Sequence, residues 1–233
     1  TDYVTKLDKT VEEIIISSLK KTYPKHSYLS EEIGLIQGSG KDIDSFWIID
    51  PLDGTTNYIH GFPYYAISIA YLERGKILHA VIIDVSSQDE FTASLGKGSY
   101  LNNRRIRVSK REGIKGALLS NSSHNTESSK IIHDNMATFR ELYLHGLTIR
   151  RTGSAALDLA NVAAGRLDGF WGSGLEVWDF AAGGLLVQEA GGLVSNYLGE
   201  TDYLKDGNII CATTKCFKPM LKAIKPFVSK KEL

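Results

Sequence analysis

Residues 47–70 read WIIDPLDGTTNYIHGFPYYAISIA, and this stretch decides how the chain is interpreted. It overlaps a short apolar run, FWIID at residues 46–50, that ends in a turn containing Pro and Gly. Such a run predicts a buried strand that delivers its last residue to a loop. Asp50 and Asp53 stand on either side of Pro51 at the exit of this strand, where α/β proteins place ligands. Because proline restricts the backbone, we expect the two carboxylates to converge without a large loss of entropy.

The loop DPLDGTT has three interpretations. Mg²⁺ takes hard oxygen ligands, and a turn through Gly54 would present backbone N–H groups to a phosphate. A solvated turn with two surface acids is the plainest alternative. The haloacid-dehalogenase pattern D-x-D-G-T uses its first Asp as a covalent nucleophile, but its acids are two apart and share one strand face. Asp50 and Asp53 are three apart with a proline between them, which favours metal binding.

Two other acidic positions draw attention. Asp179 lies in the first turn of a predicted helix at residues 177–190, where the helix dipole favours an acid, so simple capping is one interpretation. Glu31 and Glu32 follow a predicted strand at residues 26–30, and adjacent acids at a strand edge are usually solvated.

The remaining pattern indicates a layered α/β protein. Helices are predicted at residues 10–23, 128–145, 154–164, 177–190 and 216–224. Strands are predicted at residues 26–30, 46–50, 65–72, 77–85, 90–94, 105–108, 117–120, 147–150, 168–171, 193–195 and 209–212. We expect residues 1–145 to form an N-terminal α+β part carrying Glu31 and the DPLDGTT loop. Residues 146–233 would form a C-terminal α/β part carrying Asp179, and the two would make one continuous catalytic unit.

Composition excludes several classes of protein. The 233 residues include 27 Lys and Arg against 27 Asp and Glu, and this zero net charge argues against duplex DNA binding. No apolar run approaches the length of a membrane span, so we expect no membrane partner. Cys211 and Cys216 are too few for a disulfide framework and have no ligand companions for a zinc site. These features predict a reduced, cytoplasmic protein.

Taken together, four segments resemble the inositol monophosphatase family of Mg²⁺-dependent, lithium-sensitive sugar phosphatases. Residues 47–70 resemble its first signature, and VWDFAAGGLLVQEAGG at residues 177–192 resembles its second. RRTGSAALDLANVAAGRLDG at residues 150–169 is similar to its substrate-side helix, and DYVTKLD at residues 2–8 to its N-terminal strand. The resemblance runs from Asp2 to about residue 215. It implies a five-layer αβαβα sandwich.

The resemblance also implies a metal site with two or three Mg²⁺ ions. The family's ligands match Glu31, Asp50, the Leu52 carbonyl, Asp53 and Asp179. One ion would be held by Glu31, Asp50 and Leu52, and another by Asp50, Asp53 and Asp179. A third, weaker ion would lie near Glu31. In this setting capping does not account for Asp179, because a cap would not explain the neighbouring Trp and Ala-Ala-Gly.

The implied reaction is hydrolysis of a phosphate monoester by a water activated by Mg²⁺, without a covalent intermediate. Glu31 would lie beside that water, and Thr55, backed by Asp8, would help to deprotonate it. For Asp8 the simpler interpretation is an N-cap of the first helix. The N–H groups of Gly54 and Thr55 would bind the phosphate. The groups expected near the leaving alcohol are Asp53, Ser154, Ala155 and Ala156.

The chain departs from the family at Gly172. Inositol-specific members carry a Glu seven residues before the helix Asp, and losing such an acceptor weakens discrimination between substrates. Glu176 is a candidate substitute. The expected substrate is inositol 1-phosphate or a related sugar or polyol phosphate, with fructose bisphosphate, nucleotide monophosphates and phosphorylated cofactors as alternatives.

A second function comes from a different class. Bacterial relatives of the extragenic-suppressor type act with RNA polymerase and its antitermination factors, so a regulatory binding protein is the alternative hypothesis. The neutral charge does not support it, and the complete metal set favours retained catalysis. The resemblance also implies a homodimer.

Overall fold

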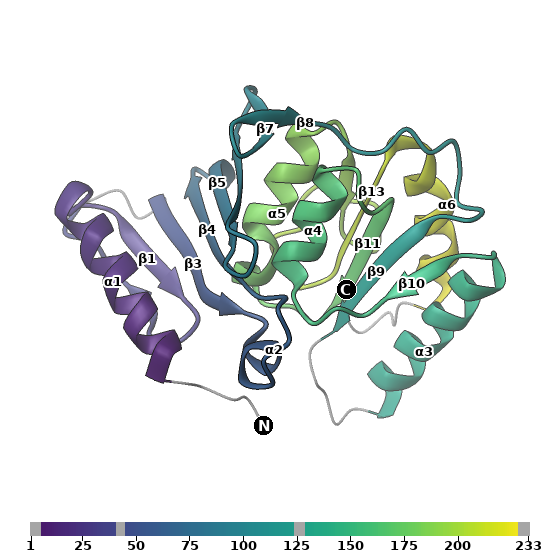
Figure 1. Ribbon diagram of the computed structural model, residues 1–233, viewed down its shortest axis with the longest axis horizontal. Helices are drawn as coiled ribbons and strands as arrows, with labels where there is room; N and C mark the ends of the chain where they lie inside the picture. Colours follow the sequence, from purple (N-terminus) through teal and green to yellow (C-terminus); the bar gives the residue numbers. More distant parts are fainter. Residues whose placement is uncertain (1–5, 41–44, 124–128, 228–233) are drawn as a thin grey trace.

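The protein is described by a computed structural model, which covers residues 6–40, 45–123 and 129–227 (Figure 1). Two sheets and six α-helices make up the described part of the chain. The helices are α1 (Lys6–Thr22), α2 (Thr55–Ile59), α3 (Ser129–Leu144), α4 (Ala155–Ala163), α5 (Val177–Glu189) and α6 (Thr214–Ile224), with a 3-10 turn at Lys225–Phe227.

Within the described residues the first sheet has eight strands in the order β2-β1-β3-β4-β5-β6-β7-β8. They are β1 (Ser27–Ser30), β2 (Gly34–Ile36), β3 (Ser45–Asp53), β4 (Ala66–Glu73), β5 (Lys76–Asp84), β6 (Asp89–Ser94), β7 (Gly98–Leu101) and β8 (Arg104–Ile106). The second sheet has the order β10-β9-β11-β13-β12. Its strands are β9 (Leu118–Ser123), β10 (Thr148–Arg150), β11 (Gly169–Ser173), β12 (Leu193–Ser195) and β13 (Ile209–Ala212).

The elements stack in five layers, which confirms the αβαβα expectation (Figure 1). Helix α1 covers the outer face of the first sheet and packs Ile16 against Tyr28 and Ile49. Helices α4 and α5 lie between the sheets, and their apolar side chains belong to one core with those of β4, β5 and β6. Helix α6 covers the outer face of the second sheet with α3 beside it. The second sheet therefore buries both faces at β11 and β13, whereas the outer face of the first sheet is covered by α1 at β3 and is half-buried at β4 and β5.

The middle layer is thin because its helices are built from small residues. All but one of the nine residues of α4 are buried, and the Ser154 hydroxyl caps its N-terminus by accepting the Leu157 N–H at 3.3 Å. On α5, a Cβ added to Gly183 would overlap Leu159 of α4. Glycine at this position therefore lets the two helices approach closely.

A β-bulge in β3 sets the geometry of the DPLDGTT loop. Asp50 pairs with Ser68 and Asp53 pairs with Ala66, so three steps along β3 oppose two steps along β4. The extra residue lies between the two acids, and Asp50 and Asp53 consequently face the same side of the sheet. The expectation that a three-residue spacing would break same-face geometry is therefore wrong, because the bulge absorbs one residue.

Several boundaries differ from the sequence expectation. Strands β2 and β7 and helix α2 were not predicted, because their sequences GLI, GSYL and TTNYI mix turn-forming and polar residues with few apolar ones. Residues 6–8, expected to be extended, belong to α1, while residues 2–5 lie outside the described part, as does residue 128 of the helix expected at residues 128–145. The chain passes from the first sheet to the second between Ile106 and Leu118. The division near residue 145 stays a prediction. Within the described ranges, no helix has the length and apolarity needed to cross a bilayer.

Candidate metal and phosphate site

The loop after β3 is held by its own hydrogen bonds. The buried carboxylate of Asp50 accepts the Leu52 N–H through Oδ1 at 2.9 Å. The Leu52 carbonyl accepts the Thr55 hydroxyl at 3.0 Å, and Gly54 between them has φ +94°. Only glycine adopts that conformation without strain, so Gly54 turns the chain from β3 into α2. The second oxygen of Asp50 remains for another contact.

Asp53 connects this loop to the start of α4. Its Oδ2 accepts the Ser154 hydroxyl at 2.5 Å and the Ala156 N–H at 2.7 Å. These donors belong to a helix N-terminus, which favours a negative charge. The structure therefore brings Asp53, Ser154 and Ala156 together across a hundred residues of sequence. Their contact with a substrate stays a prediction.

Asp179 has a capping role after all. Its Oδ2 accepts the N–H of Glu176, the N-cap residue of α5, at 2.9 Å. The argument that capping does not account for Asp179 is thus wrong, since the side chain caps the helix with one oxygen. Its second oxygen is not committed to the cap, and its charge acts on Asp50. The two roles are compatible.

Glu31 lies directly after β1, and its N–H donates to the Ile49 carbonyl at 3.3 Å. Its carboxyl group lies near enough to Asp50 for each of the two groups to influence the other's pKa. Asp8 faces the same region from α1, where it is 2 % exposed and adds to the negative potential at Glu31. Asp8 lies inside the first turn of α1, so the N-cap interpretation for it is wrong.

The four acids place their negative charge around Asp50, which is buried, whereas Asp53 and Asp179 are half-buried and Glu31 is exposed. Burial, together with neighbouring carboxylates, raises the pKa of Glu31 to about 7, although part of its side chain is open to solvent. Burial also raises the pKa of Asp53 to about 6, and hydrogen bonds from Ser154 and Ala156 oppose that rise. The pKa values of Asp50 and Asp179 rise through burial first and then through Asp53. Each group thus favours a proton or a cation nearby.

A metal ion needs several ligands that reach a single point. Among the residues that the structure describes, no three His, Cys, Asp or Glu side chains stand close enough to enclose one. The donor chemistry nevertheless fits Mg²⁺, because the converging groups are all carboxylates and carbonyls and their charge is uncompensated. The predicted ligands Glu31, Asp50, Leu52, Asp53 and Asp179 remain predictions.

Sequence reasoning missed three residues around the cluster. Glu12 of α1 is fully buried and accepts the N–H groups of Glu32 and Ile33. Asn57 donates to the carbonyls of Tyr64 and Thr152, each at 2.8 Å, which ties the loop after β3 to the segment before α4. Asp158 of α4 is the third, a buried acid that accepts the hydroxyls of Thr152 and Tyr64. Glu12 was detectable, because it lies one helical turn after Asp8 and so shares its face.

Gly172 lies in β11, buried next to Leu175 and Phe170. A Cβ at this position would overlap Leu175 and come within 3.1 Å of the Phe170 ring. Leu175 therefore occupies the space that a longer side chain would need. Glu176, the suggested substitute, is exposed at the start of α5.

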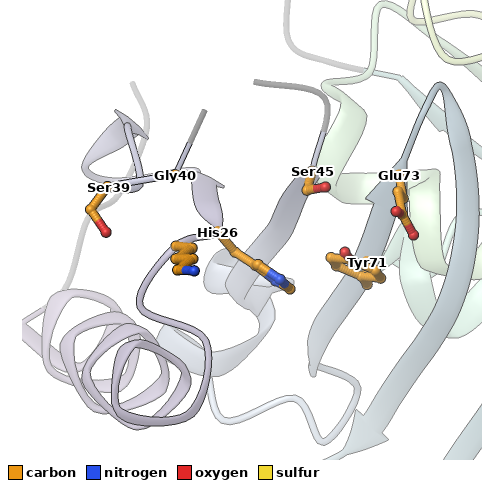
Figure 2. Close-up of a pocket in the computed structure, with 7 residues that line it drawn as sticks. His26, Ser39, Gly40, Ser45, Tyr71 and Glu73 are labelled. Carbon is orange, nitrogen blue, oxygen red and sulfur yellow. The ribbon is translucent and has the colours of Figure 1, made fainter. Parts of the chain in front are cut away.

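A pocket at the opposite end of the first sheet is separate from this cluster. Figure 2 shows His26 and Tyr71, whose rings stack at 5.2 Å, with Ser45 and Glu73 at the wall. Ser45 pairs with Glu73, five residues along β3 from the Asp50–Ser68 pair, which corresponds to about 16 Å. Gly40 and Ser45, the last and first described residues on either side of a gap in the description, both line the pocket.

Five layers with an acidic cluster at the end of a central strand define a layered α/β protein of the sugar-phosphatase type. Residues 1–228 match the sequence model of the inositol monophosphatase family. The chain belongs to this family.

Similar proteins carry two kinds of name. "Nus factor SuhB" of Pseudomonas aeruginosa is 51% identical over 97% of this chain and 83% of its own length. The crystal structure of extragenic suppressor protein suhB from Bartonella henselae has a TM-score of 0.91 at 39% identity, covering 98% of this chain and 86% of that one. The inositol monophosphatase from Anabaena has a TM-score of 0.86 at 34% identity, covering 97% and 88%.

Proposed function

We propose that this protein is a Mg²⁺-dependent phosphomonoesterase acting on inositol 1-phosphate or a related sugar or polyol phosphate. The observation that carries the proposal is that the bulge in β3 sets Asp50 and Asp53 on one face, where Asp53 is hydrogen-bonded to Ser154 and Ala156 at the start of α4. Glu31 and Asp179, from two other parts of the sequence, act electrostatically on Asp50. Membership of the inositol monophosphatase family supports the same class of reaction.

The proposed metal site uses these acids in two groups. Glu31, Asp50 and the Leu52 carbonyl would hold one ion, and Asp50, Asp53 and Asp179 would hold a second, with a third near Glu31. When bound, Mg²⁺ would offset charge on the phosphoryl group and activate water, which a slow ester hydrolysis requires.

The chain's own groups would then orient the ester. The N–H groups of Gly54 and Thr55 would bind the phosphate at the turn after β3. The Thr55 hydroxyl, which donates to Leu52 in the present arrangement, would take part in removing the proton from the attacking water, with Asp8 behind it. Ser154, Ala155 and Ala156 lie at the start of α4, on the side of Asp53 where the leaving alcohol is expected.

Substrate preference is the finer part of the proposal. Gly172 offers no side-chain acceptor to an inositol ring, and Leu175 fills the space beside it. We therefore expect a broad preference among polyol and sugar phosphates, with fructose 1,6-bisphosphate and nucleotide or cofactor phosphates as alternative substrates.

Phosphate release from a panel of esters tests the proposal directly. Inositol 1-phosphate, fructose 1,6-bisphosphate and nucleotide monophosphates are each offered with Mg²⁺, with EDTA, and with Mg²⁺ plus Li⁺. We expect Mg²⁺-dependent release that Li⁺ inhibits and that Asp50→Asn lowers by at least about 100-fold. Glu13→Gln, on the exposed side of α1, is the matched control and keeps full activity. Equal release by wild type and Asp50→Asn would refute the proposal.

A second candidate function is regulation of transcription through a protein partner. The observation favouring it is the 51% identity to a relative named Nus factor SuhB. Complementation of a strain lacking its own gene separates the two functions. A phenotype restored by wild type and by Asp50→Asn alike indicates binding, whereas loss with Asp50→Asn indicates catalysis. The homodimer implied by the family is measured by light scattering of the same purified proteins.

A further inference from the structure

Helix α1 presents two acids, one turn apart, toward the Glu31 loop. Asp8 and Glu12 are both buried, at 2 % and 0 % exposure, on a face whose next member is the buried Ile16. Asp8 acts electrostatically on Glu31. Glu12 makes a different contact, because its carboxylate binds backbone rather than facing the other acids.

The Glu12 contact fixes the residues that directly follow Glu31. Its Oε1 accepts the Glu32 N–H at 3.1 Å and the Ile33 N–H at 3.4 Å. Oε2 is buried and has no hydrogen-bond partner among the described residues. Buried carboxylate oxygens normally accept hydrogen bonds, so burying Oε2 without a partner destabilises the folded state. The other oxygen, Oε1, stabilises the turn between β1 and β2 through its two hydrogen bonds.

That turn decides where the Glu31 carboxylate points. On one side, the Glu31 N–H is bonded to Ile49 of β3, the strand that carries Asp50. On the other side, the next two N–H groups are bonded to Glu12. With both sides held, the backbone of Glu31 is fixed next to β3, the strand that carries Asp50. Without Glu12, the turn would be held by the pairing of Ser30 with Gly34 and by the Glu31 N–H, and the Glu32 and Ile33 N–H groups would lose their side-chain acceptor.

We propose that Glu12 is a positioning residue that holds Glu31 in place for cation binding by anchoring the Glu32 and Ile33 backbone. The inference rests on the proposed metal site. The role depends on the length of the side chain and not on its charge. Any acceptor at the position of Oε1 performs it, whereas a carboxylate one methylene shorter does not.

Two conservative substitutions separate reach from charge. Glu12→Gln keeps an acceptor oxygen at full length and removes the charge, while Glu12→Asp keeps the charge and cannot reach the Ile33 and Glu32 N–H groups. Ile16→Val is the matched control, since it loosens the same face of α1 one turn further on without touching the loop. All three variants are compared with wild type for thermal stability.

The first measurement needs no metal. Amide hydrogen exchange of the EDTA-treated proteins should show Glu32 and Ile33 exchanging at least tenfold faster in Glu12→Asp, and near wild-type rates in Glu12→Gln and Ile16→Val. The second is calorimetric titration with Mg²⁺ alone, in which Glu12→Asp should raise the Kd at least tenfold and the other two variants less than threefold.

The outcomes distinguish this inference from the proposed function. If wild type binds Mg²⁺ and Glu12→Asp binds it equally well, or if Glu12→Gln is as impaired as Glu12→Asp, the inference about Glu12 is overturned while the metal site stands. If wild type and Asp50→Asn give the same titration, the metal site is overturned and this inference with it. Faster exchange and weaker binding confined to Glu12→Asp support both.

Discussion

At the scale of single residues, Asp179 combines a structural and a proposed chemical role. Its Oδ2 caps α5, and its charge lies near Asp50 and Asp53. Like charges in a buried cluster oppose folding when no cation is present, whereas the cap stabilises the helix by about 1 kcal/mol. Substitutions at this position can separate the two contributions.

We expect Asp179→Asn to retain the cap, because an amide oxygen also accepts the Glu176 N–H. Its melting temperature in EDTA should equal or exceed that of wild type, while Mg²⁺-dependent activity falls about 100-fold or more. Asp179→Ala, which loses cap and charge together, serves as the comparison. A metal-free Asp179→Asn protein that melts well below wild type would show that the charge itself stabilises the fold.

Asp158 is a second buried acid, outside the proposed metal site. Its Oδ1 accepts the hydroxyls of Thr152 at 2.7 Å and Tyr64 at 2.9 Å. Its Oδ2 is buried without a hydrogen bond to any described residue, and the neighbouring Ser120 hydroxyl is in the same state. Burial, opposed by those hydrogen bonds, raises the pKa of Asp158 to about 7.

This raised pKa predicts a pH effect on stability. The folded protein binds the Asp158 proton more tightly than the unfolded chain does. The stability that this proton provides is therefore lost as the pH rises from about 4 to about 7. The loss in the free energy of unfolding is about 1.4 kcal/mol per unit of pKa difference. Asp158→Asn keeps the acceptor and removes the titration. We expect its melting temperature relative to wild type to be higher at pH 8 than at pH 5. A difference that is constant across this range would contradict the assignment.

At the scale of elements, the bulge in β3 and the close pair of α4 and α5 do most to build the site. The bulge turns a three-residue spacing into a same-face pair of carboxylates. The helix pair brings Ser154 and Asp179, the first-turn groups of α4 and α5, toward that face. Both features depend on how the backbone is arranged: the extra residue in β3 and the short distance between α4 and α5.

The helix pair gives a prediction about packing. An alanine at Gly183 would place its Cβ within 2.6 Å of Leu159 Cδ1, so the helices must separate. Overpacking of this kind costs about 1–3 kcal/mol, which lowers the melting temperature by about 2–12 °C in a protein of this size. Gly113→Ala, where no atom lies within 4 Å of the added Cβ, is the control. Equal melting of the two variants would contradict tight helix contact.

At the scale of the whole molecule, the site draws its groups from α1, the turn after β1, β3, α4 and α5 (Figure 1). The unfolded chain cannot gather these acids, so a bound cation stabilises the folded state alone. The resulting gain is RT ln(1 + [L]/Kd), or about 2.7 kcal/mol at 100 times the Kd.

Mg²⁺ at that concentration should therefore raise the melting temperature of wild type by about 5 °C or more. Asp50→Asn should show no such rise. Scans in NaCl of equal ionic strength control for screening of the acidic cluster. An equal rise in both proteins would place cation binding elsewhere on the molecule.

Much of this could be predicted from residue pattern. The long signatures around Asp50 and Asp179 and the small-residue helix between them indicated the family and the five layers, because each follows from local periodicity or from resemblance. Short elements such as α2 and β7 were missed, since they mix turn-forming and polar residues with few apolar ones. The roles of Asn57 and Glu12 were missed because their partners are distant in sequence or are backbone groups.

Local order along the chain was enough to name the acids and the strands and helices that carry them. Three features appear only in the folded structure. A bulge sets Asp50 and Asp53 on one face, and Asp179 accepts the Glu176 N–H at the start of α5. The buried Glu12 accepts the Glu32 N–H in the turn after β1. Residue types record local preference, whereas hydrogen bonds between distant segments and shared burial exist only after the layers have packed.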